Sequence, residues 1–184
     1  MRVSRMSNSG WLAPHRLVES LSIQSTIEKA ALPMLADLLG VEDVLLEMDA
    51  ASKRQLFEEI GRHMEREHAL PQAWVTESLL RREDVGSTGL GRGVAIPHAR
   101  VKNLKRMQVA YVRLTQAIPF GAPDGRPVSD ILVLLVPKQA TEEHLGILAQ
   151  ATQLFSDRDF REHLHLCQSA SEVKRLFEAR TPMP

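Results

Sequence analysis

The glycine-rich segment Gly86–His98 has residue types that suit an anion site. Glycine tolerates the positive φ angles that turn successive backbone N–H groups toward one anion, and Ser87 and Thr88 add hydroxyl donors. The glycines are Gly86, Gly89, Gly91 and Gly93. Their spacing does not fit the dinucleotide fingerprint, and the segment lacks the Gly-Lys-Ser/Thr ending of a Walker A loop. On the glycines alone, a surface turn explains the segment as well as an anion site does.

His98 ends this segment behind a proline. Pro97 has a fixed φ angle and restricts Ile96, which predicts that His98 leaves a stiff backbone with its ring direction largely set. A neutral imidazole can attack a phosphoryl group near neutral pH, and Arg82 would stabilise the transferred charge. A Pro-His pair by itself is more often structural, so the residues alone leave both interpretations open.

Interleaved helices and strands must position this segment. Apolar residues at helical spacing predict a helix over 49–68, and Pro71 begins another that closes at Glu83. We expect strands over 43–48, 107–114 and 131–136, and further helices over 141–155, 158–166 and 171–179. The interleaving and the wholly apolar run 131–136 predict an α/β fold, a single-domain sandwich with a mixed β-sheet flanked by helices on both sides.

Residues 1–31 differ in composition from the rest. They are rich in Ser, Arg and Asn and lack sustained periodicity, which indicates a flexible N-terminal extension. We therefore expect the working domain to cover residues 32–180.

The composition excludes several classes of function. The chain has 184 residues with 23 basic and 23 acidic side chains, so no bulk charge recruits nucleic acid or an anionic membrane. The single cysteine, Cys167, rules out an intramolecular disulfide and argues against a cysteine-based zinc site. The apolar runs are too short to span a bilayer, and the expected location is the cytoplasm.

Four further histidines and the cysteine suggest no second site. His163 and His165 are two positions apart on an expected helix, so their rings point away from each other into solvent. We expect His63 and His68 on a helix surface, and Cys167 as a small buried apolar residue.

A longer pattern resembles a known family. The segment Arg82–His98, read as Arg-Glu-Asp-Val-Gly-Ser-Thr-Gly-Leu-Gly-Arg-Gly-Val-Ala-Ile-Pro-His, resembles the active-site segment of the fructose/mannitol-type enzyme IIA domains of the bacterial phosphotransferase system. The resemblance continues through Pro119–Val128, Leu134–Pro137 and Glu143-His144-Leu, covers about residues 32 to 180, and is strongest to the nitrogen-regulatory members.

The resemblance implies a role for each matching residue. His98 would accept the phosphoryl group, His144 would help to position it, and Arg82 would stabilise its charge. The phosphate-binding residues would be Ser87, Thr88 and Gly89. No cofactor and no metal are implied. The chain departs from the pattern at Arg92, where relatives more often carry a neutral residue, and at Gly146, where some have a second histidine.

The implied function is that of a phosphohistidine phosphocarrier. The donor would be a histidine phosphocarrier protein of the HPr or NPr kind, and the output would be regulation of proteins such as sensor kinases or potassium transporters. We expect no nucleic-acid partner and no insertion into a membrane. Two alternatives stay open: a sugar-specific enzyme IIA that passes phosphate to a fructose or mannitol transporter, and a docking regulator that works independently of phosphorylation.

Overall fold

The computed structural model describes residues 33–139 and 142–180, all within the unit Leu32–Pro184. The expected extension over residues 1–31 lies outside the described residues.

A six-stranded mixed sheet forms the centre of this unit. The strands are β1 (Leu39–Met48), β2 (Gly89–Gly91), β3 (Val94–Ala95), β4 (His98–Val101), β5 (Gln108–Ile118) and β6 (Val128–Pro137). They follow the order β1-β5-β6-β3-β2. Strand β4 also pairs with β6, at residues that come later along β6 than those paired with β3. The β1–β5, β3–β6 and β4–β6 pairs are parallel, whereas β5–β6 and β2–β3 are antiparallel.

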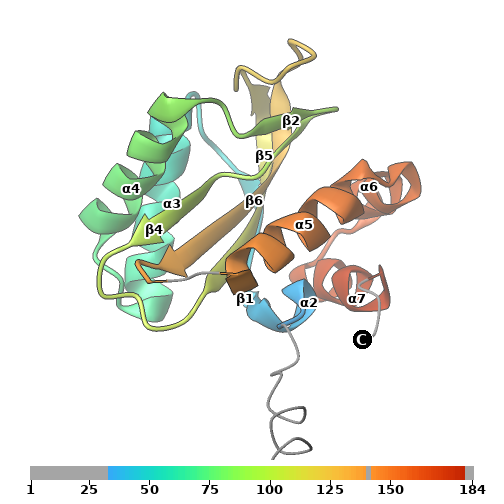
Figure 1. Cartoon of the computed structure of the whole chain (residues 1–184). Coiled ribbons are helices and arrows are strands. Elements are labelled where there is room, and N and C mark those ends of the chain that lie inside the picture. The colour runs from blue at the N-terminus through green and yellow to red at the C-terminus, as the bar shows by residue number, and fades with distance from the viewer. Residues whose placement is uncertain (1–32, 140–141, 181–184) are drawn as a thin grey trace, which may run out of the picture. The chain divides into compact units, whose positions relative to one another are not determined.

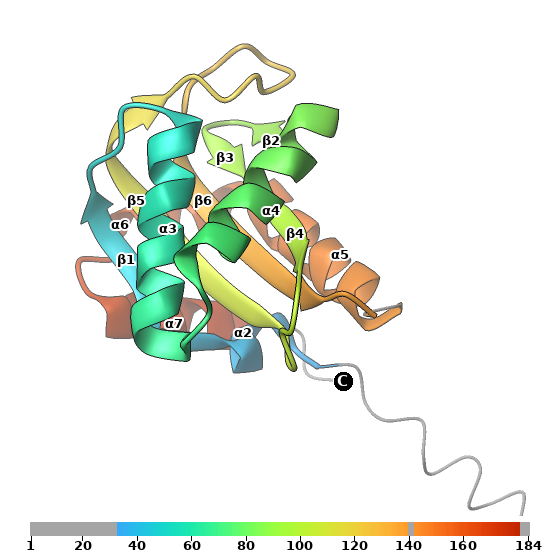
Figure 2. The ribbon, with the colours of Figure 1, turned by 90° about the vertical axis from the view of Figure 1, so that its left-hand side faces the viewer.

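Helices cover both faces of the sheet (Figures 1 and 2). One face carries α3 (Lys53–His68) and α4 (Gln72–Val85). The other carries the helices α2 (Leu35–Leu38), α5 (Glu142–Ser156), α6 (Arg158–Leu166) and α7 (Ala170–Arg180). The predicted fold class, an α/β sandwich with helices on both sides of a mixed sheet, is confirmed.

The apolar run on β6 explains why both faces are covered. Side chains alternate along a strand, so Ile131, Val133 and Leu135 enter the core under α3 and α4. Leu132, Leu134 and Val136 enter the core on the opposite face. All six are almost fully buried, as expected for a central strand.

The second core is built around Phe177 on α7. Its ring centroid lies 5.2 Å from that of Phe160, 6.2 Å from that of Phe155 and 6.1 Å from that of Tyr111. Because Tyr111 belongs to β5 and the phenylalanines to three different helices, these contacts hold the helical layer on the sheet.

A break in the edge of the sheet presents His98. Strands β3 and β4 both run parallel to β6, and Ile96 and Pro97 separate them. Pro97 has no N–H, but its carbonyl accepts a 3.0 Å hydrogen bond from the Leu134 amide, so the chain stays attached to β6 through the break. His98 is therefore the first residue of β4 and is paired with Leu134.

The longer elements lie where the sequence predicted them, with ends displaced by a few residues. Helix α3 begins later than expected, at Lys53, because the Ser52 side chain accepts a hydrogen bond from the Gln55 amide and caps it. The short elements α2, β2, β3 and β4 were not predicted, since two to four residues are too few to reveal a period.

The first prediction concerns the aromatic core. Replacing the fully buried Phe177 by alanine should lower the free energy of unfolding by about 3–5 kcal/mol, because a large cavity opens between α7 and the sheet. Urea unfolding followed by circular dichroism measures this change. Leu166→Ala, at a side chain that is 74% exposed on α6, is the control and should shift stability by less than about 0.5 kcal/mol. Similar midpoints for the two variants would contradict this account of the core.

Candidate functional site

Three of the sequence-predicted site residues line one surface cavity. His98 from β4, Arg82 from α4 and His144 from α5 border a hollow of about 760 Å³. The described lining residues also include the basic side chains Arg81, Arg100, Lys102 and Lys138, and no carboxylate. The cavity thus has the charge that an anionic group requires.

The His98 ring is held at both nitrogens. Its Nδ1 lies 2.9 Å from the Ile96 carbonyl oxygen, an acceptor, so Nδ1 carries the hydrogen in this assignment. The Arg82 Nε–H donates to Nε2 of His98 over 3.2 Å, which requires a lone pair at Nε2. The ring is therefore a neutral imidazole with its nucleophilic nitrogen at Nε2.

The surroundings of His98 favour this neutral form. Burial lowers its pKa below the ordinary value of 6.5, and the positive charge of Arg82 and the proximity of His144 lower it further. The Ile96 carbonyl and Glu83 act in the opposite direction. The net effect keeps the Nε2 lone pair available at neutral pH.

Arg82 connects the ring to the glycine-rich segment. Besides its contact with His98, it donates from Nη1 to the Gly86 carbonyl over 2.9 Å. The guanidinium is thus held between α4 and the segment's first glycine, and an arginine in this position presents further N–H donors.

His144 brings an unsatisfied polar atom to the cavity. Its Nδ1 is buried and has no hydrogen-bond partner among the described residues. Buried polar atoms are nearly always paired, so this nitrogen at the edge of a basic cavity has a hydrogen-bonding capacity that no described residue uses.

Ser87, Thr88 and Gly89 are engaged within the chain. The Ser87 hydroxyl donates to the Phe120 carbonyl over 2.7 Å and accepts from the Gly89 amide over 3.1 Å. The Thr88 hydroxyl and amide both donate to Glu83, over 2.6 and 3.1 Å. None of these residues is among those that line the cavity of His98.

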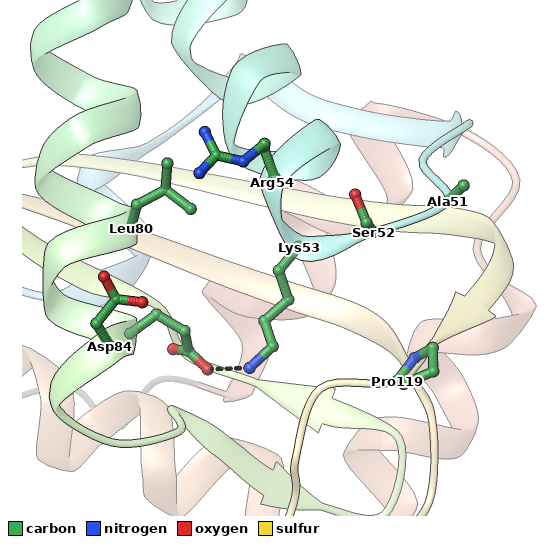
Figure 3. Close-up of a pocket in the computed structure, with 8 residues that line it drawn as sticks. Ala51, Ser52, Lys53, Arg54, Leu80, Asp84 and Pro119 are labelled. Carbon is green, nitrogen blue, oxygen red and sulfur yellow. Dashed lines mark hydrogen bonds and ion pairs between the residues drawn. The ribbon is translucent and has the colours of Figure 1, made fainter.

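Glu83 is a residue that sequence reasoning missed. It accepts the Thr88 donors and forms an ion pair of 2.8 Å with Lys53, while only 6% of its side chain is exposed. Figure 3 shows the Lys53 side chain extending from the start of α3 across a neighbouring pocket toward this partner. The only sequence signal was its place directly after Arg82 in the family-like segment.

The alternating glycines form a hairpin turn between β2 and β3. Gly91, Arg92 and Gly93 all have positive φ angles, of 88°, 57° and 81°. The Arg92 amide donates to Asp124 over 2.7 Å, and its guanidinium donates to the Ser156 carbonyl over 3.2 Å. Arg92 therefore links the hairpin to the end of α5.

The predictions for the other histidines and for the cysteine have mixed outcomes. His163 and His165 are exposed and Cys167 is buried, as predicted, and burial raises the pKa of the Cys167 thiol. The prediction that His63 lies on a helix surface was wrong, since only 3% of its side chain is exposed. His68 is 17% exposed and faces the same buried carboxylate, Asp43, that His63 does.

In the described part of the chain, no helix has the length and apolar character needed to cross a membrane.

Comparison with known proteins identifies the family of the chain. Residues 37–180 match the family described as phosphoenolpyruvate-dependent sugar phosphotransferase system, EIIA 2. The chain is 36% identical to a nitrogen regulatory protein of Pseudomonas aeruginosa, over 72% of this chain and 86% of that protein. It is 31% identical to a fructose-specific EIIA component of Haloferax volcanii, over 76% of this chain and 92% of that one.

Solved structures show the same fold. The nitrogen regulatory protein IIA-Ntr of Neisseria meningitidis superposes with a TM-score of 0.74 at 45% identity, covering 78% of this chain and 98% of that one. The mannitol IIA of Escherichia coli shares the fold at a TM-score of 0.64 and 22% identity, covering 75% and 97% of the two chains. The chain belongs to the type-2 EIIA family of the phosphotransferase system, with nitrogen-regulatory IIA proteins among its relatives.

Proposed function

We propose that this chain is a regulatory phosphocarrier that accepts a phosphoryl group on Nε2 of His98. The observation that carries the proposal is the neutral His98 ring, with Nδ1 bonded to a carbonyl and Nε2 facing Arg82 in a basic cavity. The proposed donor is a phosphorylated histidine phosphocarrier protein of the HPr or NPr kind. Residues 32–180 would be the working domain, residues 1–31 an extension, and the cytoplasm the place of action.

The transfer is an in-line exchange of one nitrogen for another. The Nε2 lone pair of His98 forms the new N–P bond as the donor's N–P bond breaks, and the bonding pair returns to the donor imidazole. The His98 ring becomes positively charged during attack. The Ile96 carbonyl, which accepts the Nδ1 hydrogen, stabilises that charge.

Arg82 and His144 would act on the phosphoryl oxygens. Arg82 exchanges its contact with Nε2 for charge-assisted hydrogen bonds to the phosphoryl group. His144 would meet an oxygen with the Nδ1 atom that lacks a partner among the described residues. The implied phosphate contacts of Ser87, Thr88 and Gly89 stay a prediction, because they require these groups to leave their present partners.

A regulatory output is proposed over a sugar-specific one. Several relatives that match at 30–36% identity are named nitrogen regulatory proteins. Phosphorylation adds close to two negative charges to a basic cavity, which changes the partners that can dock there. Sensor kinases and potassium transporters are the proposed classes of regulated protein.

The fructose-specific relative supports the sugar-specific alternative. Incubation of the phosphorylated chain with a fructose-specific enzyme IIB domain separates the two functions. Retention of phosphate on this chain supports the regulatory proposal, and rapid onward transfer supports the alternative.

The acceptor is tested by phosphorylation in solution. With phosphoenolpyruvate, the general phosphotransferase enzyme and a histidine phosphocarrier, the intact chain should gain one acid-labile phosphate by mass spectrometry. His98→Ala should gain none while keeping the wild-type circular dichroism spectrum, because only the reacting ring is removed. Labelling of that variant at the wild-type level would sink the assignment of His98.

The role of His144 predicts a slower reaction at an unchanged acceptor. His144→Ala should still be labelled on His98 but about 100-fold more slowly, the usual effect of losing one donor to a developing charge. Rapid-quench kinetics give the rate. His163→Ala, at an exposed histidine on α6, is the matched control and should react like wild type; equal rates for the two variants would contradict the positioning role of His144.

The pKa of His98 can be measured directly. In the unphosphorylated chain its NMR titration midpoint should lie below 6.5, so the ring loses its lone pair only as pH falls through that lower value. Arg82→Gln should raise the midpoint toward 6.5, because a positive charge beside the ring disappears. Arg158→Gln removes an exposed charge on α6 and should leave the midpoint unchanged. A midpoint that stays or falls in Arg82→Gln contradicts the electrostatic role.

A further inference from the structure

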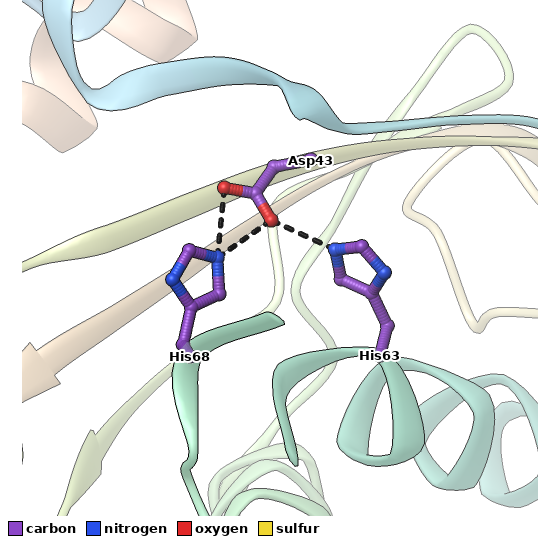
Figure 4. A group of neighbouring side chains, drawn as sticks. All are labelled: Asp43, His63 and His68. Carbon is purple, nitrogen blue, oxygen red and sulfur yellow. Dashed lines mark hydrogen bonds and ion pairs between the residues drawn. The ribbon is translucent and has the colours of Figure 1, made fainter. Parts of the chain in front are cut away.

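A second cluster of imidazoles lies away from His98, between β1 and the end of α3. Asp43 on β1 lies between His63 and His68 (Figure 4). The His63 Nε2 is 2.7 Å from Oδ1 of Asp43, and the His68 Nε2 is 2.8 Å from Oδ1 and 3.0 Å from Oδ2. Both rings therefore present the same nitrogen to one carboxylate.

The backbone holds these groups in place. Asp43 and His63 are each about 3% exposed, so strand pairing and helix packing fix their side chains. His68 is the last residue of α3, and Ala69 follows with a φ angle of 53° and donates its amide to the Glu65 carbonyl. This closed helix end directs His68 back toward Asp43 and alongside His63, with ring centroids 6.4 Å apart.

We propose that Asp43, His63 and His68 form a binding site for a divalent transition metal of the zinc class. Two imidazole nitrogens and a carboxylate are a ligand set that such ions prefer, and the ligand atoms all lie within 4.8 Å of one another. The ion would take the place now held by the hydrogens between the rings and the carboxylate. The partial exposure of His68 leaves a side from which the ion and a water molecule as fourth ligand can enter.

To bind the ion, the two nitrogens must move slightly away from Oδ1, and their mutual separation, which is at most 4.8 Å, must reach the value of a tetrahedral site. Metal–ligand bonds of about 2.0–2.1 Å in a tetrahedron separate neighbouring ligand atoms by about 3.3 Å. The nitrogens are now 2.7 and 2.8 Å from Oδ1, so each would move by roughly half an ångström.

Arg66 favours the tautomer of His63 that cannot bind a metal through Nε2, and this effect can be tested by substitution. Its Nη2 lies 3.1 Å from Nδ1 of His63 and donates to it, whereas a ring that binds metal through Nε2 carries its hydrogen on Nδ1. Arg66 must therefore move aside, which its 66% exposed side chain permits. A residue that accepts from Nδ1 should favour the metal-bound tautomer instead.

None of Asp43, His63 and His68 lines the phosphoryl cavity. Lys53, which contacts Glu83, begins α3, and His68 ends it, so about 22 Å of helix separate the two. The ion would tie β1 to the end of α3, a structural role that does not depend on the proposed phosphocarrier function.

The test compares thermal unfolding of the chelator-treated full chain with and without zinc chloride. At a zinc concentration 100 times the dissociation constant, the wild-type Tm should rise by about 5–10 °C. His68→Gln should abolish the rise, since glutamine keeps a hydrogen-bond donor toward Asp43 but supplies no imidazole. Because His68 is at a helix end and partly exposed, this variant is the one least expected to disturb folding.

Three further variants separate this site from adventitious binding. His163→Gln should keep the full rise in Tm, because it changes an exposed histidine of α6. His98→Ala should also keep it, because it changes the phosphoryl cavity. Arg66→Gln should bind zinc about tenfold more tightly by isothermal titration, because an acceptor replaces a donor at Nδ1 of His63. No zinc effect on the wild type, a rise that survives in His68→Gln, a rise lost in His98→Ala or His163→Gln, or weaker binding by Arg66→Gln would each overturn the proposal.

Discussion

The site depends on one hydrogen bond, between Nδ1 of His98 and the carbonyl of Ile96 two residues earlier. A histidine with a free ring presents either nitrogen, and its tautomer changes with its surroundings. Here the carbonyl accepts a hydrogen bond from Nδ1–H, so Nε2 is the nitrogen left to face the cavity. Proline makes this possible, because it interrupts the edge strand without releasing the chain from β6.

The second requirement is that the glycine-rich segment keeps its shape beside the ring. The side chain of Glu83 is almost fully buried, accepts hydrogen bonds from Thr88 and forms an ion pair with Lys53. A buried carboxylate is costly unless it is paired, and here its partners come from α3 and from the segment itself. Helix α3, which covers the sheet, therefore also helps to hold the glycine-rich segment through Lys53 and Glu83. The packing of the core and the geometry of the site depend on the same helix.

Burial and the charge of Arg82 lower the pKa of His98, against the opposing effects of the Ile96 carbonyl and Glu83. Burial disfavours the charged imidazole and Arg82 disfavours it further, while the basic side chains around the cavity attract a phosphoryl group. A positively charged pocket therefore keeps its nucleophile neutral and its substrate attracted. This combination needs no cofactor for the proposed transfer and agrees with the family to which the chain belongs.

The long elements, the two-faced burial of β6 and the segment around His98 could be predicted from the amino-acid sequence, because these are local patterns of period, proline and glycine. The resemblance of ordered segments added His144 to His98 and Arg82. Only the tertiary structure decided that all three line one cavity, that the Thr88 donors go to Glu83, and that His63 is buried against a strand. Periodicity along one element reports which side chains are buried, but the order of the strands determines which distant residues meet.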